Sequence, residues 1–467
     1  MQSSRSRAGL TTSSVGLRPR RHASSLKGSA CTRLRPTARI RSSRKSPARR
    51  SSRLAAKRLP QVSQSSRSRA TPSSDTIASP TSRTSNSHRQ SSERILDLLW
   101  TVTGIWGIIF PEKHRGDVQT RGTGMVRARA PVRIDFAGGW TDVARFARES
   151  AGAVVNAAIS IYSYASVRRD PAAPDSGGGI RIYATDFDLY IEAADIRRLE
   201  YDGNADLLKA AIRHLNVDES FFITTRSDAP PGSGLGTSAA MGVALIGALS
   251  RLVARPLLAH EVAELASEIE REELHILGGK QDQYASALGG LQFMEFHGET
   301  VRAAPLRLAP ATEFDLQKHL VLCYTEHSRL SGDIHQRVTE AFRKGEANTT
   351  RAIADLKRIA RAMKERLLLG DLEGFARLMS DNWANQKRLH PSVTNERIDE
   401  LFAIAAESGA AGGKACGAGG GGCLVFIAKP DREHILRQAL KEAGARLLDF
   451  VFDHSGLQVI HDSPAAS

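Results

Sequence analysis

Residues 228–249 read DAPPGSGLGTSAAMGVALIGAL and join a glycine-rich turn to a long apolar segment. The three alternating glycines lack the Cβ atoms that would keep an anion away from the backbone. The Thr-Ser pair stands where a new helix has unpaired N–H groups and the positive end of its dipole. We therefore predict a phosphate-binding loop made of Pro231, Gly232, Ser233, Gly234, Leu235, Gly236, Thr237 and Ser238.

The spacing in this loop excludes two common nucleotide motifs. A Walker loop ends in Gly-Lys-Ser/Thr, and a dinucleotide fingerprint needs GxGxxG, whereas this loop has only the GxG of Gly234 and Gly236. The alternative is a glycine-rich helix entry with an ordinary Ser/Thr cap. The longer pattern PGSGLGTSAA is rare by chance, which favours phosphate binding.

A second candidate for chemistry is Arg133, which stands between Val132 and Ile134 in a strand-like run that ends at a glycine pair. A buried arginine needs an anionic partner, which would be a ligand phosphate, a catalytic carboxylate or a structural ion pair. The glycine pair permits a sharp turn that would leave three side chains facing a cleft. These three candidates are Trp140, Thr141 and Asp142.

Two acidic residues and a second glycine run follow the phosphate loop. Asp282 comes after a glycine pair, where a carboxylate either projects into a site or caps a helix, and Glu270 lies 12 residues earlier. The run at 412–422 has seven glycines in eleven positions, so we expect no regular element there. A flexible linker is the alternative, but the run lies directly between a predicted helix and a buried strand, which favours close approach to a ligand.

The elements that must position these residues follow from hydrophobic pattern. A strand, a glycine loop and a buried helix are expected in order around the phosphate loop. The predicted strands cover 126–136, 162–167, 179–185, 221–225, 320–324 and 423–428, with 162–167 and 179–185 forming a hairpin. The predicted helices cover 239–253, 260–277, 333–344, 349–369, 372–388 and 395–408.

The first quarter of the chain differs from the rest in charge. Residues 1–90 contain 21 Lys/Arg and the single acid Asp75, so the net charge of +15 comes from this tail and the remainder is about −5. Such an Arg/Ser-rich segment is expected to be disordered. It is compatible with a transit peptide, with a nucleic-acid-binding arm, or with upstream DNA translated from a start codon placed too early, and Met125 before the first strand favours the third.

Two further features bear on location. The apolar stretch at 95–110 has 16 residues and contains Asp97, which is shorter than the roughly 20 residues that span a bilayer. The four cysteines form no CxxC pair, and a body of this size needs no disulfides, which indicates a reducing, cytoplasmic setting. No His/Cys group has zinc-ligand spacing.

The motifs APVRIDFAGGWTD, PPGSGLGTSAA, GGKQDQ and GGKACGAGGGGC, in this order, resemble the signature set of the GHMP small-molecule kinases. The resemblance covers essentially all of the chain from Met125. It implies an α/β (α+β) fold of two domains, with an N-terminal half like ribosomal protein S5 domain 2 and a ferredoxin-like C-terminal half. We expect the extension at 1–124, the ATP-binding domain at 125–310 and the C-terminal domain at 311–467.

The resemblance also implies roles for the candidate residues. The loop would wrap the ATP phosphates, while Ser238 and Glu270 would ligate Mg²⁺. Asp282 would be the catalytic aspartate, and Arg133 beside it would keep that carboxylate ionised and help to neutralise the transferred phosphoryl group. Asp142, with Trp140 and Thr141, would hold sugar hydroxyls. From the second glycine run we expect substrate contacts at Gly417, Gly419 and Gly420.

The motifs also favour one branch of the family. Gly139 and Trp140 stand where galactokinase-like motifs have Glu-His, which argues against galactose and resembles the branch that phosphorylates the anomeric hydroxyl of heptose 7-phosphate or L-fucose. A phosphorylated sugar needs a cationic site distant from the ATP phosphates. We expect Arg329 and Lys387 there, and Lys280 and Lys414 nearer ATP.

Three other functions are also compatible with the sequence. They are a kinase of an unphosphorylated sugar such as L-fucose or galactose, a diphosphomevalonate decarboxylase type of enzyme, and a non-catalytic nucleotide-binding regulator. The expected ligands are ATP, Mg²⁺ and a small sugar or sugar phosphate. We expect no nucleic-acid partner for the folded body and no membrane association, and a homodimer is compatible with the sequence.

Overall fold

The computed structural model describes residues 124–169, 179–193, 199–217, 220–326 and 331–462. These residues belong to one compact unit, Lys113–Ser467. The predicted extension at 1–124, apart from its last residue, lies outside the described residues, as do the apolar stretch at 95–110 and Arg329. Among the helices of the described ranges, none is long and apolar enough to cross a bilayer.

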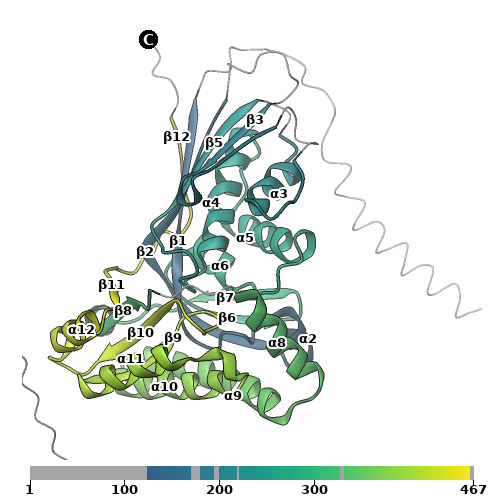
Figure 1. Ribbon diagram of the computed structural model, residues 1–467. Coiled ribbons are helices and arrows are strands. Elements are labelled where there is room, and N and C mark those ends of the chain that lie inside the picture. Colours follow the sequence, from purple (N-terminus) through teal and green to yellow (C-terminus); the bar gives the residue numbers. More distant parts are fainter. Residues whose placement is uncertain (1–123, 170–178, 194–198, 218–219, 327–330, 463–467) are drawn as a thin grey trace, which may run out of the picture. The chain divides into compact units, whose positions relative to one another are not determined.

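An eight-stranded mixed sheet forms the N-terminal half (Figure 1). Its strand order is β12-β1-β2-β5-β3-β4, with β6 on β2 and β7 on β6. All pairs are antiparallel except the parallel pair of β3 and β5. The strands are β1 (Met125–Ala137), β2 (Gly152–Arg169), β3 (Ile180–Ala184), β4 (Leu189–Ala193), β5 (Phe221–Ser227), β6 (Leu291–His297), β7 (Thr300–Pro305) and β12 (Gln458–Asp462).

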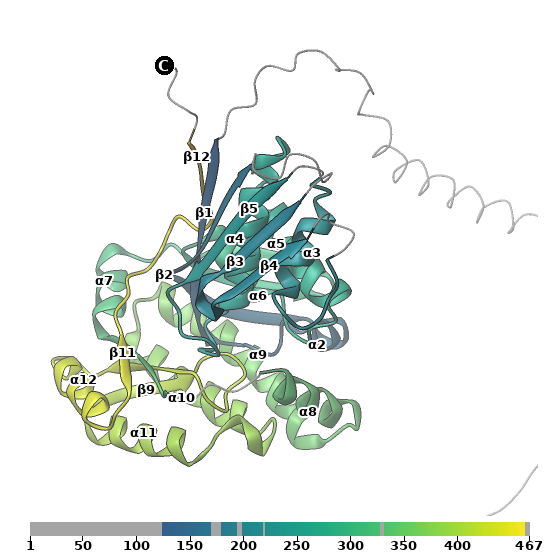
Figure 2. The same ribbon diagram turned by 45° about the horizontal axis from the view of Figure 1, so that its top comes forward.

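Helix α4 (Thr237–Leu252) packs along β1 and β2 and is the central helix of this half (Figures 1 and 2). Its alanine- and leucine-rich sequence is buried on nearly every side, as expected for a helix covered by both a sheet and other helices. The neighbouring helices are α2 (Ala144–Ser150), α3 (Asp206–His214), α5 (Ala259–Glu268), which continues into a π-turn at Ile269–Glu273, and α6 (Gln281–Leu288).

A four-stranded antiparallel sheet, in the order β11-β8-β10-β9, forms the C-terminal half. Helices α10, α11 and α12 pack against it, while α9 packs on α10 and on β2 of the first sheet. The strands are β8 (Leu320–Tyr324), β9 (Ala410–Ala415), β10 (Cys423–Ala428) and β11 (Arg446–Leu448). The helices are α7 (Pro310–His319), α8 (Ser331–Arg343), α9 (Ala347–Leu368), α10 (Leu372–Lys387), α11 (Glu396–Glu407) and α12 (Glu433–Glu442).

The last strand crosses back between the halves. β12 pairs with β1, so the C-terminal segment belongs to the first sheet although it follows the second one in sequence. The domain boundary at 310/311 remains a prediction. β12 follows this boundary in the sequence, whereas β1, with which it pairs, precedes it.

Two local predictions were wrong. The segments 162–167 and 179–185 do not form a hairpin, because β5 lies between β2 and β3 and pairs with both of them. Part of the second glycine run is regular, since Gly412 and Gly413 are extended in β9. A Cβ at Gly412 would overlap the Ala376 carbonyl of α10, and a Cβ at Gly413 would overlap the Phe426 ring of β10. The glycines there permit close packing within a strand.

Candidate active site

The predicted phosphate loop lies between β5 and α4, as the strand, loop and helix pattern indicated. Gly232, Gly234 and Gly236 have φ values of +65°, +73° and +77°, which side chains rarely adopt. Gly236 is the N-cap of α4 and makes no side-chain cap. The first N–H groups of α4 and its positive dipole end therefore face the loop, an arrangement that favours an anion.

The same glycines bring three segments together. A Cβ at Gly234 would lie 2.7 Å from the carbonyl oxygen of Cys416 in the second glycine run. A Cβ at Gly236 would lie 3.1 Å from Oδ2 of Asp282. The backbone N–H of Cys423 donates to the Ser233 carbonyl at 2.7 Å. The phosphate loop, the second glycine run and the candidate catalytic aspartate are thus in direct contact.

Arg133 and Asp282 form a bidentate ion pair. Nε of Arg133 donates to Oδ1 at 2.8 Å and Nη2 donates to Oδ2 at 2.7 Å, while Nη1 donates to the Gly234 carbonyl at 2.7 Å. Burial alone would lower the pKa of Arg133, but the charges of Asp282 and Asp135 and the hydrogen bonds to Asp282 together raise it. The Asp282 side chain is 27% exposed against 4% for Arg133, so a permanently charged arginine holds a carboxylate that solvent and substrate can reach.

Ser238 and Glu270 meet beside the loop. The Ser238 hydroxyl donates to Glu270 Oε1 at 2.7 Å, and the Gln283 amide donates to Oε2. Burial raises the pKa of Glu270 to about 7, although the hydrogen bond from Ser238 lowers it. A hydroxyl and a carboxylate are oxygen ligands that suit Mg²⁺, and a bound cation would offset the cost of ionising Glu270 in this buried position. The residues present therefore fit a magnesium ion.

The Asp142 carboxylate packs against the start of α6, the helix that carries Asp282. It is 4% exposed and accepts from the backbone N–H of Gln281 at 3.2 Å, and a Cβ at Gly279 would overlap its carboxylate. Burial raises the pKa of Asp142 to about 7, and the charge of Asp282 adds to the increase. At neutral pH this carboxyl group can both donate and accept a hydrogen bond.

The two residues before Asp142 have different surroundings. Trp140 has φ of +81° and packs on His335 of α8 with ring centroids 4.4 Å apart, and its buried Nε1 has no hydrogen-bond partner in the described chain. The Thr141 hydroxyl donates to the Gly138 carbonyl at 2.7 Å and accepts from the Ala153 N–H at 3.0 Å. The hydroxyl of Thr141 therefore holds the turn, whereas Trp140 keeps a free donor.

Lys414 and Lys280, two of the four cations considered for phosphate binding, form ion pairs with acidic residues of the chain. Lys414 is fully buried and donates to Oδ2 and to the carbonyl oxygen of Asp135 at 2.9 and 2.7 Å. Lys280 is bonded to Glu264 at 2.5 Å and to the carbonyl of Glu299 at 2.8 Å. Both lysines are thus ion-paired within the described chain, and a role for either of them toward ATP stays a prediction.

Lys387 lies at the end of α10, with Nζ 5.7 Å from the Trp383 ring centroid and 3.9 Å from Asp399, and its side chain is 40% exposed. Its neighbour Gln386 donates to the Gly417 carbonyl at 2.9 Å. Gln386 thus contacts the second glycine run, whereas the contacts of Lys387 in the described chain are with Trp383 and Asp399 and not with the catalytic pair.

The three glycines predicted to touch substrate pack against protein. A Cβ at Gly417 would lie 2.9 Å from the Gly234 carbonyl, and a Cβ at Gly419 would lie 2.5 Å from the Val393 carbonyl. The Gly420 carbonyl accepts from the Asn395 side chain at 3.0 Å. These contacts fix the second glycine run against the phosphate loop and the segment before α11.

Sequence reasoning missed Asp135, Gln281 and Gln283. Asp135 shares a face of β1 with Arg133, and two charged residues at i and i+2 in the apolar, fully buried second half of this strand are a signal for a buried polar site. Gln281 and Gln283 flank Asp282 in the first turn of α6 and bond Asp142 and Glu270. The amide-acid-amide order around Asp282 was visible, but its partners were distant in sequence.

A glycine loop at a helix N-terminus, beside an accessible carboxylate held by a buried arginine, defines an enzyme that transfers a phosphoryl group. Residues 205–290 match the model of the GHMP kinases N terminal domain, and residues 352–446 match that of GHMP kinases C terminal.

Three relatives each match about 70% of this chain. D-glycero-alpha-D-manno-heptose 7-phosphate kinase of Campylobacter jejuni is 33% identical over 340 residues, which are 71% of this chain and 98% of that protein. The crystal structure of a D-glycero-D-manno-heptose 1-phosphate kinase from Bacteroides thetaiotaomicron has a TM-score of 0.59 at 33% identity and covers 72% of this chain and 98% of that one. The bifunctional fucokinase/GDP-fucose pyrophosphorylase of Arabidopsis thaliana is 27% identical over 68% of this chain and 31% of that protein.

The chain belongs to the GHMP kinase family and is an ATP-dependent kinase. The predicted family and fold class are confirmed.

Proposed function

We propose that the enzyme transfers the γ-phosphoryl group of ATP to the anomeric hydroxyl of D-glycero-D-manno-heptose 7-phosphate. The observation that carries this proposal is the Arg133–Asp282 pair in contact with the phosphate loop, in a chain 33% identical to a heptose 7-phosphate kinase along almost all of that protein.

The reaction follows from the positions of these groups. The sugar hydroxyl oxygen attacks the γ-phosphorus, the bond from that phosphorus to the β-bridging oxygen breaks, and ADP leaves. Asp282 orients the hydroxyl and takes its proton, and Arg133 holds the carboxylate in place through two hydrogen bonds. The N–H groups at the start of α4 hold the ATP phosphates. Mg²⁺, held by Ser238 and Glu270, would neutralise charge on the phosphates.

Polar groups of Asp142, Trp140 and Asn156 support a hydroxyl-rich acceptor. Asp142 can donate and accept, the Trp140 indole N–H is free, and Asn156 Oδ1 is buried without a partner in the described chain. Sugar hydroxyls would satisfy such groups, since an unpaired buried donor or acceptor costs about 1–3 kcal/mol. For the phosphate of the sugar we keep Arg329 and Lys387 as the proposed cations.

A second candidate is a kinase of an unphosphorylated sugar, favoured by the similarity to the fucokinase of Arabidopsis thaliana. A non-catalytic regulator is disfavoured by the intact Arg133–Asp282 pair and by the Ser238–Glu270 contact. A cytoplasmic location also stays a proposal, supported by the free, buried cysteines Cys323, Cys416 and Cys423.

The first test of substrate choice is a panel assay of ADP release with heptose 7-phosphate, L-fucose, galactose, mannose and mevalonate. We expect heptose 7-phosphate to give a kcat/KM at least about tenfold above the others, because a bound phosphate adds charge-assisted hydrogen bonds. A higher kcat/KM for an unphosphorylated sugar would overturn the heptose assignment and leave the kinase assignment intact.

A further inference from the structure

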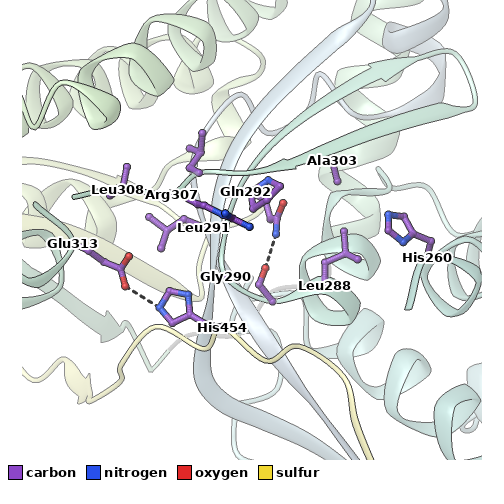
Figure 3. Close-up of a pocket in the computed structure, with 13 residues that line it drawn as sticks. His260, Leu288, Gly290, Leu291, Gln292, Ala303, Arg307, Leu308, Glu313 and His454 are labelled. Carbon is purple, nitrogen blue, oxygen red and sulfur yellow. Dashed lines mark hydrogen bonds and ion pairs between the residues drawn. The ribbon is translucent and has the colours of Figure 1, made fainter. Parts of the chain in front are cut away.

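A cavity of about 510 Å³ is shown with its lining residues in Figure 3. It lies at the end of α6 opposite to Asp282, because Leu288, the last residue of α6, lines it. Its walls come from the end of α6, the start of β6, the end of β7 with the segment after it, and the first turns of α5 and α7, with His454 closing one side. The volume is in the range of small-molecule sites. α6 has eight residues and is therefore roughly 12 Å long. None of the catalytic-site residues described above lines this cavity.

Gln292 gives the cavity an unsatisfied acceptor. Its side chain is 5% exposed, and Nε2 donates to the Gly289 carbonyl at 2.7 Å. Its buried Oε1 has no hydrogen-bond partner among the described residues. Leaving a buried acceptor unpaired costs about 1–3 kcal/mol, and a ligand hydroxyl would remove that cost.

Arg307 gives the cavity an available positive charge. In the described ranges this exposed side chain makes neither a hydrogen bond nor an ion pair, and Figure 3 shows it extending toward Gln292. The Glu313 carboxylate on the same wall is engaged by His454 at 2.8 Å, which leaves the guanidinium free for a ligand. A planar guanidinium suits a carboxylate or a phosphate, each of which can accept two hydrogen bonds from it.

We propose that this cavity binds a small hydroxylated anion, with its anionic group on Arg307 and a hydroxyl on Oε1 of Gln292. The apolar side chains of Leu288 and Leu291 form the rest of the surface and would cover the carbon skeleton.

The segment that closes the cavity is joined to the end of α6 by backbone hydrogen bonds. The Gly290 N–H donates to the Asp453 carbonyl at 2.6 Å, and the Leu457 N–H donates to the Ala287 carbonyl at 3.1 Å. The segment that carries His454 is thus held against the end of α6, which forms one wall of the cavity. Ligand binding at this cavity does not depend on the proposed kinase function.

The binding test is calorimetric titration of the full chain, without nucleotide, using glycerol 3-phosphate, glycerate and uncharged glycerol as probes. We expect at least one of the two anions to bind with a Kd below about 1 mM, and glycerol to show no saturation. Tighter binding of glycerol 3-phosphate would identify a phosphate ligand, and tighter binding of glycerate a carboxylate ligand.

Two charge reversals locate the bound probe. Arg307→Glu should weaken anion binding at least about tenfold. Arg302→Glu on β7 changes the same charge at an exposed side chain that does not line the cavity, and it should leave the Kd within about twofold. Equal affinity in all three proteins, or no saturable binding of either anion, would overturn the site. If the wild-type enzyme phosphorylated no sugar in the panel assay, the proposed function would be overturned and not this site.

Discussion

Asp142 is buried beside Asp282, and burial raises its pKa from the ordinary value of 3.8 to about 7. The native state therefore binds this proton more tightly than the unfolded state does, and the associated stabilisation is lost as pH rises from about 4 to about 7. Asp142→Asn removes the titration and keeps an oxygen for the Gln281 N–H. The free energy of unfolding of the variant minus that of wild type should therefore be larger at pH 8 than at pH 5, by at least about 1 kcal/mol.

Urea unfolding at the two pH values measures this difference. Asp399→Asn is the matched control, because that side chain is 52% exposed and should shift the unfolding free energy equally at both pH values. If the difference between Asp142→Asn and wild type did not change with pH, Asp142 would not be a carboxyl group with a raised pKa.

Among the elements, the phosphate loop depends on Gly234 for both its conformation and its contacts. Gly234→Ala would strain a residue with φ of +73° and would place a Cβ 2.7 Å from the Cys416 carbonyl. Gly203→Ala is the control, since Gly203 has φ of +87° but a Cβ added there would meet no described atom within 4 Å. We expect a loss of about 1 kcal/mol for Gly203→Ala from strain alone.

Gly234→Ala should also affect ATP binding, which Gly203→Ala should leave unchanged. We expect Gly234→Ala to weaken ATP binding at least about tenfold, because the loop and the second glycine run must separate to fit the methyl group. Calorimetric titration with ATP compares the two variants. Equal ATP affinities would mean that the close approach at Gly234 does not shape the phosphate site.

The elements also show what could be predicted from sequence. β8 and β10 were predicted with their observed bounds, and α4 within two residues, because each is a short local pattern of apolar residues. The hairpin prediction for β2 and β3 was wrong because strand partners are chosen over long sequence distances, and β5 comes about 40 residues later. Local periodicity contains no information on which strand intervenes.

The candidate site shows the same limit. The contact between Asp282 and Arg133 was predicted because both residues belong to motifs of one family pattern. The structure shows this contact. The ion pairs of Lys280 and Lys414 could not be predicted, because their acidic partners are 16 and 279 residues away and nothing in either local sequence marks those pairs. Burial of a charge is decided by the tertiary fold.

For the whole molecule, we predict that a protein beginning at Met125 folds and keeps full activity. Met125 is the first residue of β1 and lies opposite Arg168 of β2 and Asp462 of β12, so the described sheet begins there. We expect a Tm within about 2 °C of the full chain and kcat within about twofold. Insolubility of the shorter protein, or a loss of activity on truncation, would contradict this prediction.

The turnover of Asp282→Asn tests the proposed catalytic mechanism most directly. Asparagine keeps the shape of the side chain and an acceptor for Arg133, but it cannot take the proton of the sugar hydroxyl. We predict that kcat falls at least about a hundredfold while the Kd for ATP changes by less than about threefold, because the α4 N-terminus and the loop are untouched. Near wild-type turnover by Asp282→Asn would contradict the assignment of the catalytic residue.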